Sequence, residues 1–230
     1  MIDRYALFRI NDLQSRFRLN SSVDDTSRSY NISPTQLAIV IVERDGIPCL
    51  ERMKWGFIPV GAKDAHSVFR YKTFNVRSEG IFSKSQWSEA IRHRRCLVPA
   101  NGFYVWQSGE GGKIPYYVRP DDQDLFAFAG IYSSWQDPSG KDWGTYSLVT
   151  VATDDARGNS DRMPIILRPE TEPIWLDQTV NDASTLYDLM RPYPSEKLHV
   201  DEVGSEISSM KADNPRLVTP IRRERGARDI

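Results

Sequence analysis

Short stretches in which apolar and aromatic residues dominate recur along most of the chain, and short polar segments separate them. Their content of β-branched and aromatic residues is typical of β-strands. We expect strands at 37–43, 49–57, 95–99, 102–107, 114–119, 124–132 and 145–153. Turn-forming residues at 44–46, 108–113 and 136–142 indicate hairpin or loop connections between them. This order predicts strands that mostly pair with their neighbours in sequence.

Helical patterns are few. Residues 83–94 place apolar side chains at helical spacing, with Ser85 as the expected N-cap, and residues 182–192 end at a proline. We therefore expect an α+β fold, built mainly on an antiparallel β-sheet or open barrel with a few peripheral helices.

The strand pattern begins almost at the first residue. Tyr5, Leu7 and Phe8 already have the character of a strand, although most chains begin with a few residues outside the fold. At the other end, residues 222–230 are charged and interrupted by glycine, and we expect a disordered tail there. The prediction is a single domain over residues 1–221.

The composition is that of an ordinary globular protein, with 40% hydrophobic and 27% charged residues in a chain of 230. A net charge of −1 excludes a global basic field, so nucleic acid would need a local basic patch. The apolar run 37–42 is far shorter than a membrane-spanning helix of about 20 residues, and we expect neither a membrane segment nor a secretory signal. Two cysteines, Cys49 and Cys96, indicate no disulfide framework, so we expect a cytoplasmic setting.

Several kinds of reactive site can be weighed against simpler interpretations. His93 lies close to Cys96 in the sequence, but Cys96 begins an apolar run and is expected to be a buried core thiol rather than a nucleophile. The cysteines and histidines match no metal-ligand spacing, and we expect no metal and no cofactor. The glycine-rich segment 108–113 lacks the spacing of a phosphate loop and is expected to be a hairpin turn.

Aromatic and basic side chains alternate within residues 69–80. Aromatic faces stack on unpaired bases and cations hold phosphates, which is how proteins bind single strands. A solvated strand with a buried aromatic face gives the same pattern, so both interpretations stay open. In the segment 161–167, Arg162 lies on a turn that Pro164 makes rigid, which suits either a fixed anion contact or a buried salt bridge.

Seven sequence blocks stand out by their order: YNISP (30–34), MKWGFIP (53–59), FNVRSEG (74–80), RCLVPANGFYVW (95–106), FAGIY (128–132), LVTVAT (148–153) and DRMPIIL (161–167). Taken together they resemble the signature blocks of the SOS response-associated peptidase (SRAP) family, over a range from Arg4 to about Pro220. The resemblance implies the SRAP fold. It also implies binding of single-stranded DNA and capture of abasic sites, whose ring-opened sugar carries an aldehyde.

The resemblance also implies which residues carry the chemistry. In the family, a cysteine at position 2 becomes N-terminal, and its amine and thiol close a thiazolidine ring on the aldehyde, assisted by an asparagine, a glutamate and a histidine. Asn75 matches the asparagine. Ile2, Val105 and Ser160 stand where the cysteine, the glutamate and the histidine are expected. These replacements imply a catalytically degenerate member, in which Ile2 and Val105 pack together in place of the reactive pocket.

The positions that hold DNA in the family match their blocks: Arg4, Trp55, Asn75, Arg77, Thr150, Arg162 and Pro164. Arginines at these positions are expected to contact phosphates. Trp55 is expected to stack on a base, which contributes about 1–3 kcal/mol.

Three functional hypotheses follow. The first is a protein that binds single-stranded or abasic DNA in a DNA-damage response, without covalent crosslinking or self-processing. The second is a regulatory or interaction protein that kept only the fold. The third is an enzyme that uses another group, either the Met1 amine in a reversible Schiff base or Ser160 as a weak acid. Since Ile2 is large, we expect Met1 to be retained.

Overall fold

The structure is a computed structural model that describes residues 2–20, 27–62, 64, 72–109, 111–153 and 162–221. Its strands are β1 (Tyr5–Leu7), β2 (Ser29–Ile32), β3 (Leu37–Arg44), β4 (Ile47–Trp55), β5 (Asn75–Arg77), β6 (Arg95–Ala100), β7 (Gly102–Gly109), β8 (Gly112–Pro120), β9 (Phe126–Gln136), β10 (Asp142–Ala152), β11 (Arg162–Pro164), β12 (Ile166–Leu167) and β13 (Leu198–Glu202). The α-helices are α1 (Leu13–Phe17), α3 (Ser85–His93), α4 (Glu172–Leu176) and α5 (Ala183–Leu189). Short 3₁₀ helices include η1 (Ile10–Asp12), η3 (Ser78–Gly80), η5 (Ser205–Ser208) and η6 (Pro215–Val218).

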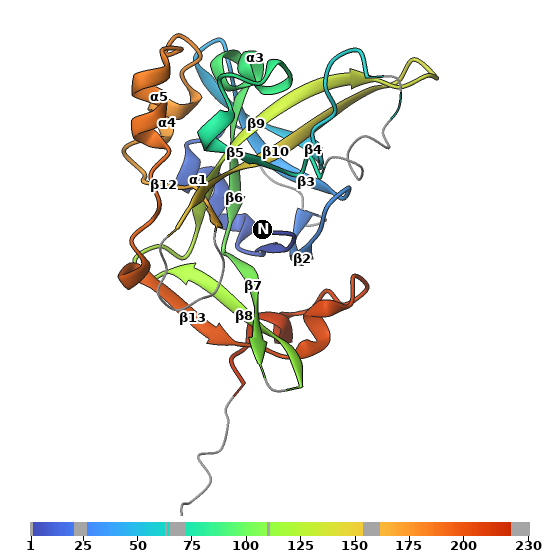
Figure 1. The fold of residues 1–230 in the computed structure, drawn as a ribbon, viewed down its shortest axis with the longest axis vertical. Coiled ribbons are helices and arrows are strands. Elements are labelled where there is room, and N and C mark those ends of the chain that lie inside the picture. The colour runs from blue at the N-terminus through green and yellow to red at the C-terminus, as the bar shows by residue number, and fades with distance from the viewer. Residues whose placement is uncertain are drawn as a thin grey trace, which may run out of the picture.

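Five strands close into a ring that forms the main body of the molecule (Figure 1). The order is β10, β4, β3, β6 and β9, and β9 pairs with β10 to complete the ring. All these pairings are antiparallel except that of β10 with β4. The expected fold, mainly antiparallel with few helices, is confirmed, and the pairing of β9 with β10 closes the barrel.

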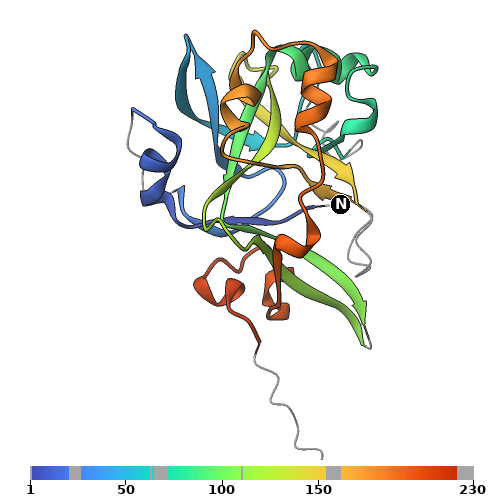
Figure 2. The same cartoon turned by 90° about the vertical axis from the view of Figure 1, so that its left-hand side faces the viewer.

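A second sheet of five strands, ordered β13-β8-β7-β1-β2, extends from the barrel. Figures 1 and 2 show the β7–β8 hairpin reaching away from the barrel, with β13 and the last 3₁₀ turns beside it. β1 lies inside this sheet, since Tyr5 is opposite Phe103 of β7 on one side and Ile32 of β2 on the other. The strand expected at Tyr5 and Leu7 is therefore present.

The expected strands and both expected helices are present, but the start of α3 differs from the prediction. Ser85 is the first helical residue, and the N-cap is the extended Lys84, whose side chain makes no capping hydrogen bond. α5, in contrast, is capped by Asp182, whose carboxylate accepts from the Thr185 amide at 2.8 Å. No helix within the described ranges is both long and apolar enough to cross a membrane. Residues 222–230 lie outside the described part of the chain, so the disordered tail stays a prediction.

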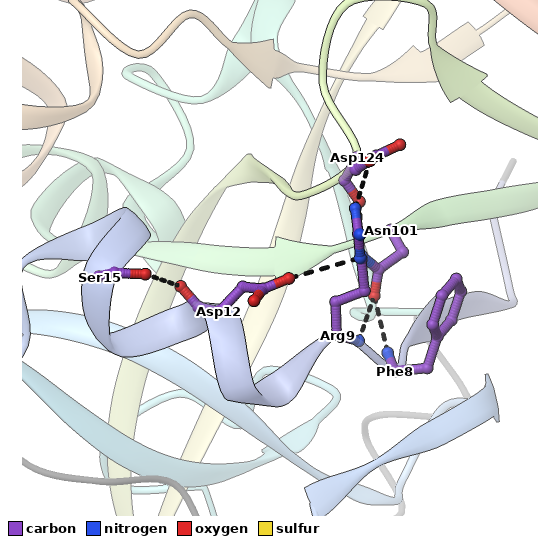
Figure 3. Close-up of polar contacts among 6 residues, drawn as sticks. All are labelled: Phe8, Arg9, Asp12, Ser15, Asn101 and Asp124. Atoms are coloured by element: carbon purple, nitrogen blue, oxygen red, sulfur yellow. Dashed lines mark hydrogen bonds and ion pairs between the residues drawn. The ribbon is translucent and has the colours of Figure 1, made fainter.

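The Asn101 side chain forms hydrogen bonds both to the chain just beyond β1 and to the loop before β9 (Figure 3). Its buried side-chain oxygen accepts from the backbone amides of Phe8 at 2.7 Å and Arg9 at 3.0 Å, and its amide donates to the Asp124 carbonyl at 2.5 Å. The next residue, Gly102, lies so close to Tyr117 that a Cβ atom would be 2.3 Å from its ring. The Asn-Gly pair therefore sets the register of the N-terminal strand.

We expect Asn101→Ala to lower the free energy of unfolding by about 2–4 kcal/mol, because the variant leaves two part-buried backbone amides without an acceptor. Urea unfolding followed by tryptophan fluorescence measures this loss. Asn181→Ala, at an exposed position, is the matched control and should change stability by less than about 0.5 kcal/mol. Equal losses in both variants would contradict the proposed fastening role.

Candidate functional site

The side chain of Ile2 is buried, with 2% of its surface exposed. Its backbone carbonyl accepts a hydrogen bond of 2.5 Å from the Asn75 side-chain amide. Val105, on β7, is half-buried and packs against the same apolar cluster that contains Ile2. Both apolar residues thus belong to or pack against one large apolar cluster. Direct packing of Ile2 against Val105 stays a prediction, and Asn75 holds the backbone at the beginning of the chain.

Several polar atoms near this point have no hydrogen-bond partner among the described residues. They are Asp3 Oδ1, Arg4 Nε and Asn75 Oδ1, and all three are buried. Arg4 does donate through Nη1 to the Asp3 carbonyl at 3.0 Å, and burial raises the pKa of the Asp3 carboxyl. Because buried polar atoms are nearly always paired, the beginning of the chain is one of the places where the described residues leave hydrogen-bonding capacity unused.

A cavity of about 260 Å³ lies beside Asn75. It is bounded by β5, β10, β11 and the beginning of α3, and its lining residues are Lys72, Asn75, Val76, Arg77, Lys84, Gln86, Trp87, Thr150 and Arg162. Four of these residues are cationic and none is acidic. The lining is therefore suited to an anion, and Asn75 connects it to Ile2.

Among the described residues, Glu79 and Thr150 hold Arg162 at the cavity wall. Its guanidinium donates to the Glu79 carboxylate at 3.0 and 2.7 Å, and to the Thr150 hydroxyl at 3.2 Å and carbonyl at 2.8 Å. Hydrogen bonds from Arg162 hold the pKa of Glu79 at about 2. Of the two interpretations open from the sequence, the salt bridge is the arrangement present, although half of the Glu79 side chain is exposed.

Thr150 acts within this network rather than as a surface contact. Its hydroxyl is buried and donates to the Val76 carbonyl at 3.0 Å while it accepts from Arg162. Pro164 is also buried, opposite Thr150 in the pairing of β10 with β11. Arg77, in contrast, is exposed at the cavity and is the more exposed of its two lining arginines.

Trp55 does not have the expected geometry for stacking on a base. Its ring is 0% exposed and stacks on Tyr146, while its indole N–H donates to the Phe74 carbonyl at 2.7 Å. Tyr5 packs edge-on against it, and the Tyr5 and Tyr146 hydroxyls share a hydrogen bond of 2.7 Å. Both indole faces are thus occupied by the core, and this position contributes packing.

Cys96 is the buried core thiol that the sequence predicts. It is 0% exposed, and burial raises the pKa of its thiol well above the ordinary value. Cys49 and Cys96 are both free. The part of the chain described by the structure contains no group of three or more residues that could hold a metal ion.

Two sequence-predicted positions are outside the described residues, and one residue of the site was not predicted. Met1 and Ser160 lie outside the described residues, as do residues 69–71 of the aromatic and basic segment. Glu79 is the residue that sequence reasoning missed, although it belongs to the block 74–80. The available signal was a carboxylate in the same block as Asn75 and Arg77, but its partner lies 83 residues further along the chain.

The Glu79–Arg162 pair should make stability depend on pH below about 4.5. Since the pKa of Glu79 is lower in the folded state, about 2 against 4.5, the stabilisation is present above 4.5 and is lost as the pH falls towards 2. Exposure of Glu79 reduces the effect to about 1 kcal/mol. Urea unfolding at pH 5.5 and pH 3 should show this loss in the wild type and not in Glu79→Gln.

The control is Glu51→Gln, which removes the same charge from an ion pair with Arg44. The Glu51→Gln variant should lose as much unfolding free energy between pH 5.5 and pH 3 as the wild type does. If Glu79→Gln and the wild type lose the same unfolding free energy on acidification, the Glu79–Arg162 pair is not the source of that loss.

Comparisons with known proteins agree on one family. A sequence model of the SOS response associated peptidase (SRAP) family matches residues 1–210. The abasic site processing protein YoqW of Bacillus subtilis (strain 168) is 31% identical over 95% of this chain and 99% of its own. The abasic site processing protein HMCES of Gallus gallus is 31% identical over 84% of this chain and 66% of its own. A crystal structure of a protein from Bacteroides thetaiotaomicron superposes with a TM-score of 0.84 at 25% identity, covering 95% of this chain and 99% of that one.

Proposed function

The chain belongs to the SOS response-associated peptidase (SRAP) family, and from this premise we propose that it binds single-stranded DNA carrying an abasic site without becoming crosslinked to it. The observation that carries the proposal is the cationic cavity, which Asn75 connects to a second residue that has no nucleophilic side chain. Its similarity to abasic site processing proteins of other organisms supports DNA as the ligand. We further propose a role in a DNA-damage response in the cytoplasm.

The proposal that the protein binds DNA rests on local positive charge. The net charge of the chain is −1, so attraction for a polyanion must come from a concentrated patch. Lys72, Arg77 and Lys84 are exposed residues that line one cavity, and none has an ion-pair partner among the described residues. Phosphate contacts of this kind position a strand without reading its sequence.

The proposal that no crosslink forms rests on the side chains of Ile2 and Val105. A thiazolidine needs an amine and a thiol on adjacent carbons, and Ile2 supplies no thiol. A carboxylate buried beside the first residues would be costly without a partner, and Val105 removes that cost where the family has a glutamate. Neither Ile2 nor Val105, which belong to or pack against one apolar cluster, supplies a group for stable ring closure on an aldehyde.

A second candidate function is a reversible Schiff base through the Met1 amine. One observation favours it: Asn75 binds the carbonyl of Ile2 and also lines the cavity. An amine one residue before Ile2 is thus tethered near the site of a bound strand. Attack on the aldehyde would form a carbon–nitrogen double bond and release water, and the reverse reaction would restore both partners.

We expect no heat-stable adduct when the protein is mixed with a single-stranded oligonucleotide containing an abasic site. A band that persists through heating in denaturing gels, without reductant, would contradict this. Borohydride should trap an adduct if the Met1 amine forms a Schiff base. The control is the same oligonucleotide with an intact base at that position, which should give no adduct under any condition.

The same mixture, run in a native gel, separates the remaining hypotheses. Retardation that weakens with salt, with no adduct, supports the binding module. Absence of retardation at low salt would contradict DNA binding and favour the regulatory protein that kept only the fold.

Arg77→Ala should weaken binding about five- to tenfold for every sequence tested, because its guanidinium faces phosphate rather than a base. The slope of log K against log salt concentration should become shallower by about 0.7, the value for one contact to a single strand. Fluorescence anisotropy with two oligonucleotides of different sequence measures both quantities. Arg191→Ala, an exposed arginine outside the cavity, is the control and should bind as the wild type does.

A further inference from the structure

Arg162 differs from the other cations of the cavity in that its hydrogen-bonding capacity is already committed. A guanidinium has five N–H donors. Four of them are used by Glu79 and Thr150, one on Nε, one on Nη1 and both on Nη2. A phosphate that binds Arg162 with two parallel hydrogen bonds must therefore replace one of these partners.

Glu79 is the partner that can leave. Its side chain is 51% exposed, whereas that of Arg162 is 15% exposed, and Glu79 does not line the cavity. Thr150 is buried and fixed in β10, so it would keep the guanidinium in place while the carboxylate moves. A carboxylate and a phosphate bind the same edge of a guanidinium in the same bidentate manner.

We propose that Glu79 is an internal competitor for the backbone phosphate of a bound strand, so that Arg162 contacts DNA only when Glu79 is displaced. The inference rests on the proposed DNA binding at this cavity and adds a specificity-determining residue to it. The ligand class is a phosphodiester within a strand.

This competition discriminates between ligands. A strand brings several phosphates, and its contacts to Lys72, Arg77 and Lys84 offset the loss of the Glu79–Arg162 pair. A single small anion makes only one contact and must displace Glu79 alone. The ion pair therefore favours a polyanion over free phosphate, and it reduces the positive charge that the empty cavity presents to solvent.

The alternative role for Glu79 is positioning, in which the carboxylate orients Arg162 for the ligand. The two roles predict opposite signs for a variant that removes the charge. Glu79→Gln retains an oxygen that can accept from the Ala152 amide, as Oε1 does at 3.2 Å, but it no longer forms an ion pair with Arg162. A competitor predicts tighter DNA binding by this variant, and a positioning residue predicts weaker binding.

The test is fluorescence anisotropy of a labelled single-stranded oligonucleotide over a series of salt concentrations, using the full chain. Glu79→Gln should bind the oligonucleotide about fivefold more tightly than the wild type. The slope of log K against log salt concentration should be steeper by about 0.7 for this variant. Inorganic phosphate should compete more effectively against the variant than against the wild type. Weaker or unchanged binding by Glu79→Gln would overturn the inference.

Two further variants separate this effect from a general change in charge. Glu51→Gln removes a carboxylate from a similar arginine pair outside the cavity, with 2.6 Å between Arg44 and Glu51, and should not change affinity. In an Arg162→Ala background, Glu79→Gln should give no gain. A gain that persists without Arg162 would also overturn the inference.

The outcomes distinguish this inference from the proposed function. If the wild type binds and Glu79→Gln binds no better, the competition is absent while DNA binding stands. If neither protein binds, both the proposed function and the inference are wrong. Should Glu79→Gln not fold, as judged by its thermal unfolding midpoint, Glu79→Asp replaces it, and its shorter reach should give a smaller gain with the same sign.

Discussion

The insertion of β1 between β7 and β2 is the constraint on which the rest of the structure depends. Main-chain pairing on both sides of Tyr5 places the second residue inside the protein, and the hydrogen bond from Asn75 to the Ile2 carbonyl joins it to the barrel side of the molecule. Asn101 fixes the other end of the strand. These contacts make the Ile2 side chain part of the interior.

The buried polar groups near the first residues differ from the buried arginine at the start of β6. Arg95 is fully buried, yet its guanidinium donates to five backbone carbonyls, namely those of Ile91, Arg92, Trp175, Asp177 and Val180. Such a cation fixes α3 and α4 and has no donor left for a ligand. Near the first residues, in contrast, Asp3, Arg4 and Asn75 each keep a buried polar atom without a partner among the described residues.

The long strands could be predicted because their apolar content and flanking turns are local properties. Of the short strands, β1 was indicated by Tyr5 and Leu7, whereas β2, β5, β11 and β12 could not be bounded in this way. Their two to four residues carry no periodic signal, and their pairing is set by distant strands. The same limit applies to side chains. The residues adjacent to Trp55 in the sequence do not indicate that Tyr5 and Tyr146 pack against its ring. Likewise, the residues adjacent to Arg162 do not indicate Glu79 as its partner.

Apart from Asn75, the cavity and the two described apolar replacements lie on different elements of this fold. The cations of the cavity come from the turn before β5, from β5 itself, from the residue before α3 and from β11. The replaced positions that are described lie on the segment before β1 and on β7. Asn75 is the residue that touches both, through its amide on Ile2 and its place in the cavity wall. The positive charge of the cavity therefore does not depend on Ile2 or Val105, neither of which lines it. Under the proposed function, DNA binding at the cavity is compatible with apolar side chains at both positions because its electrostatics do not involve them.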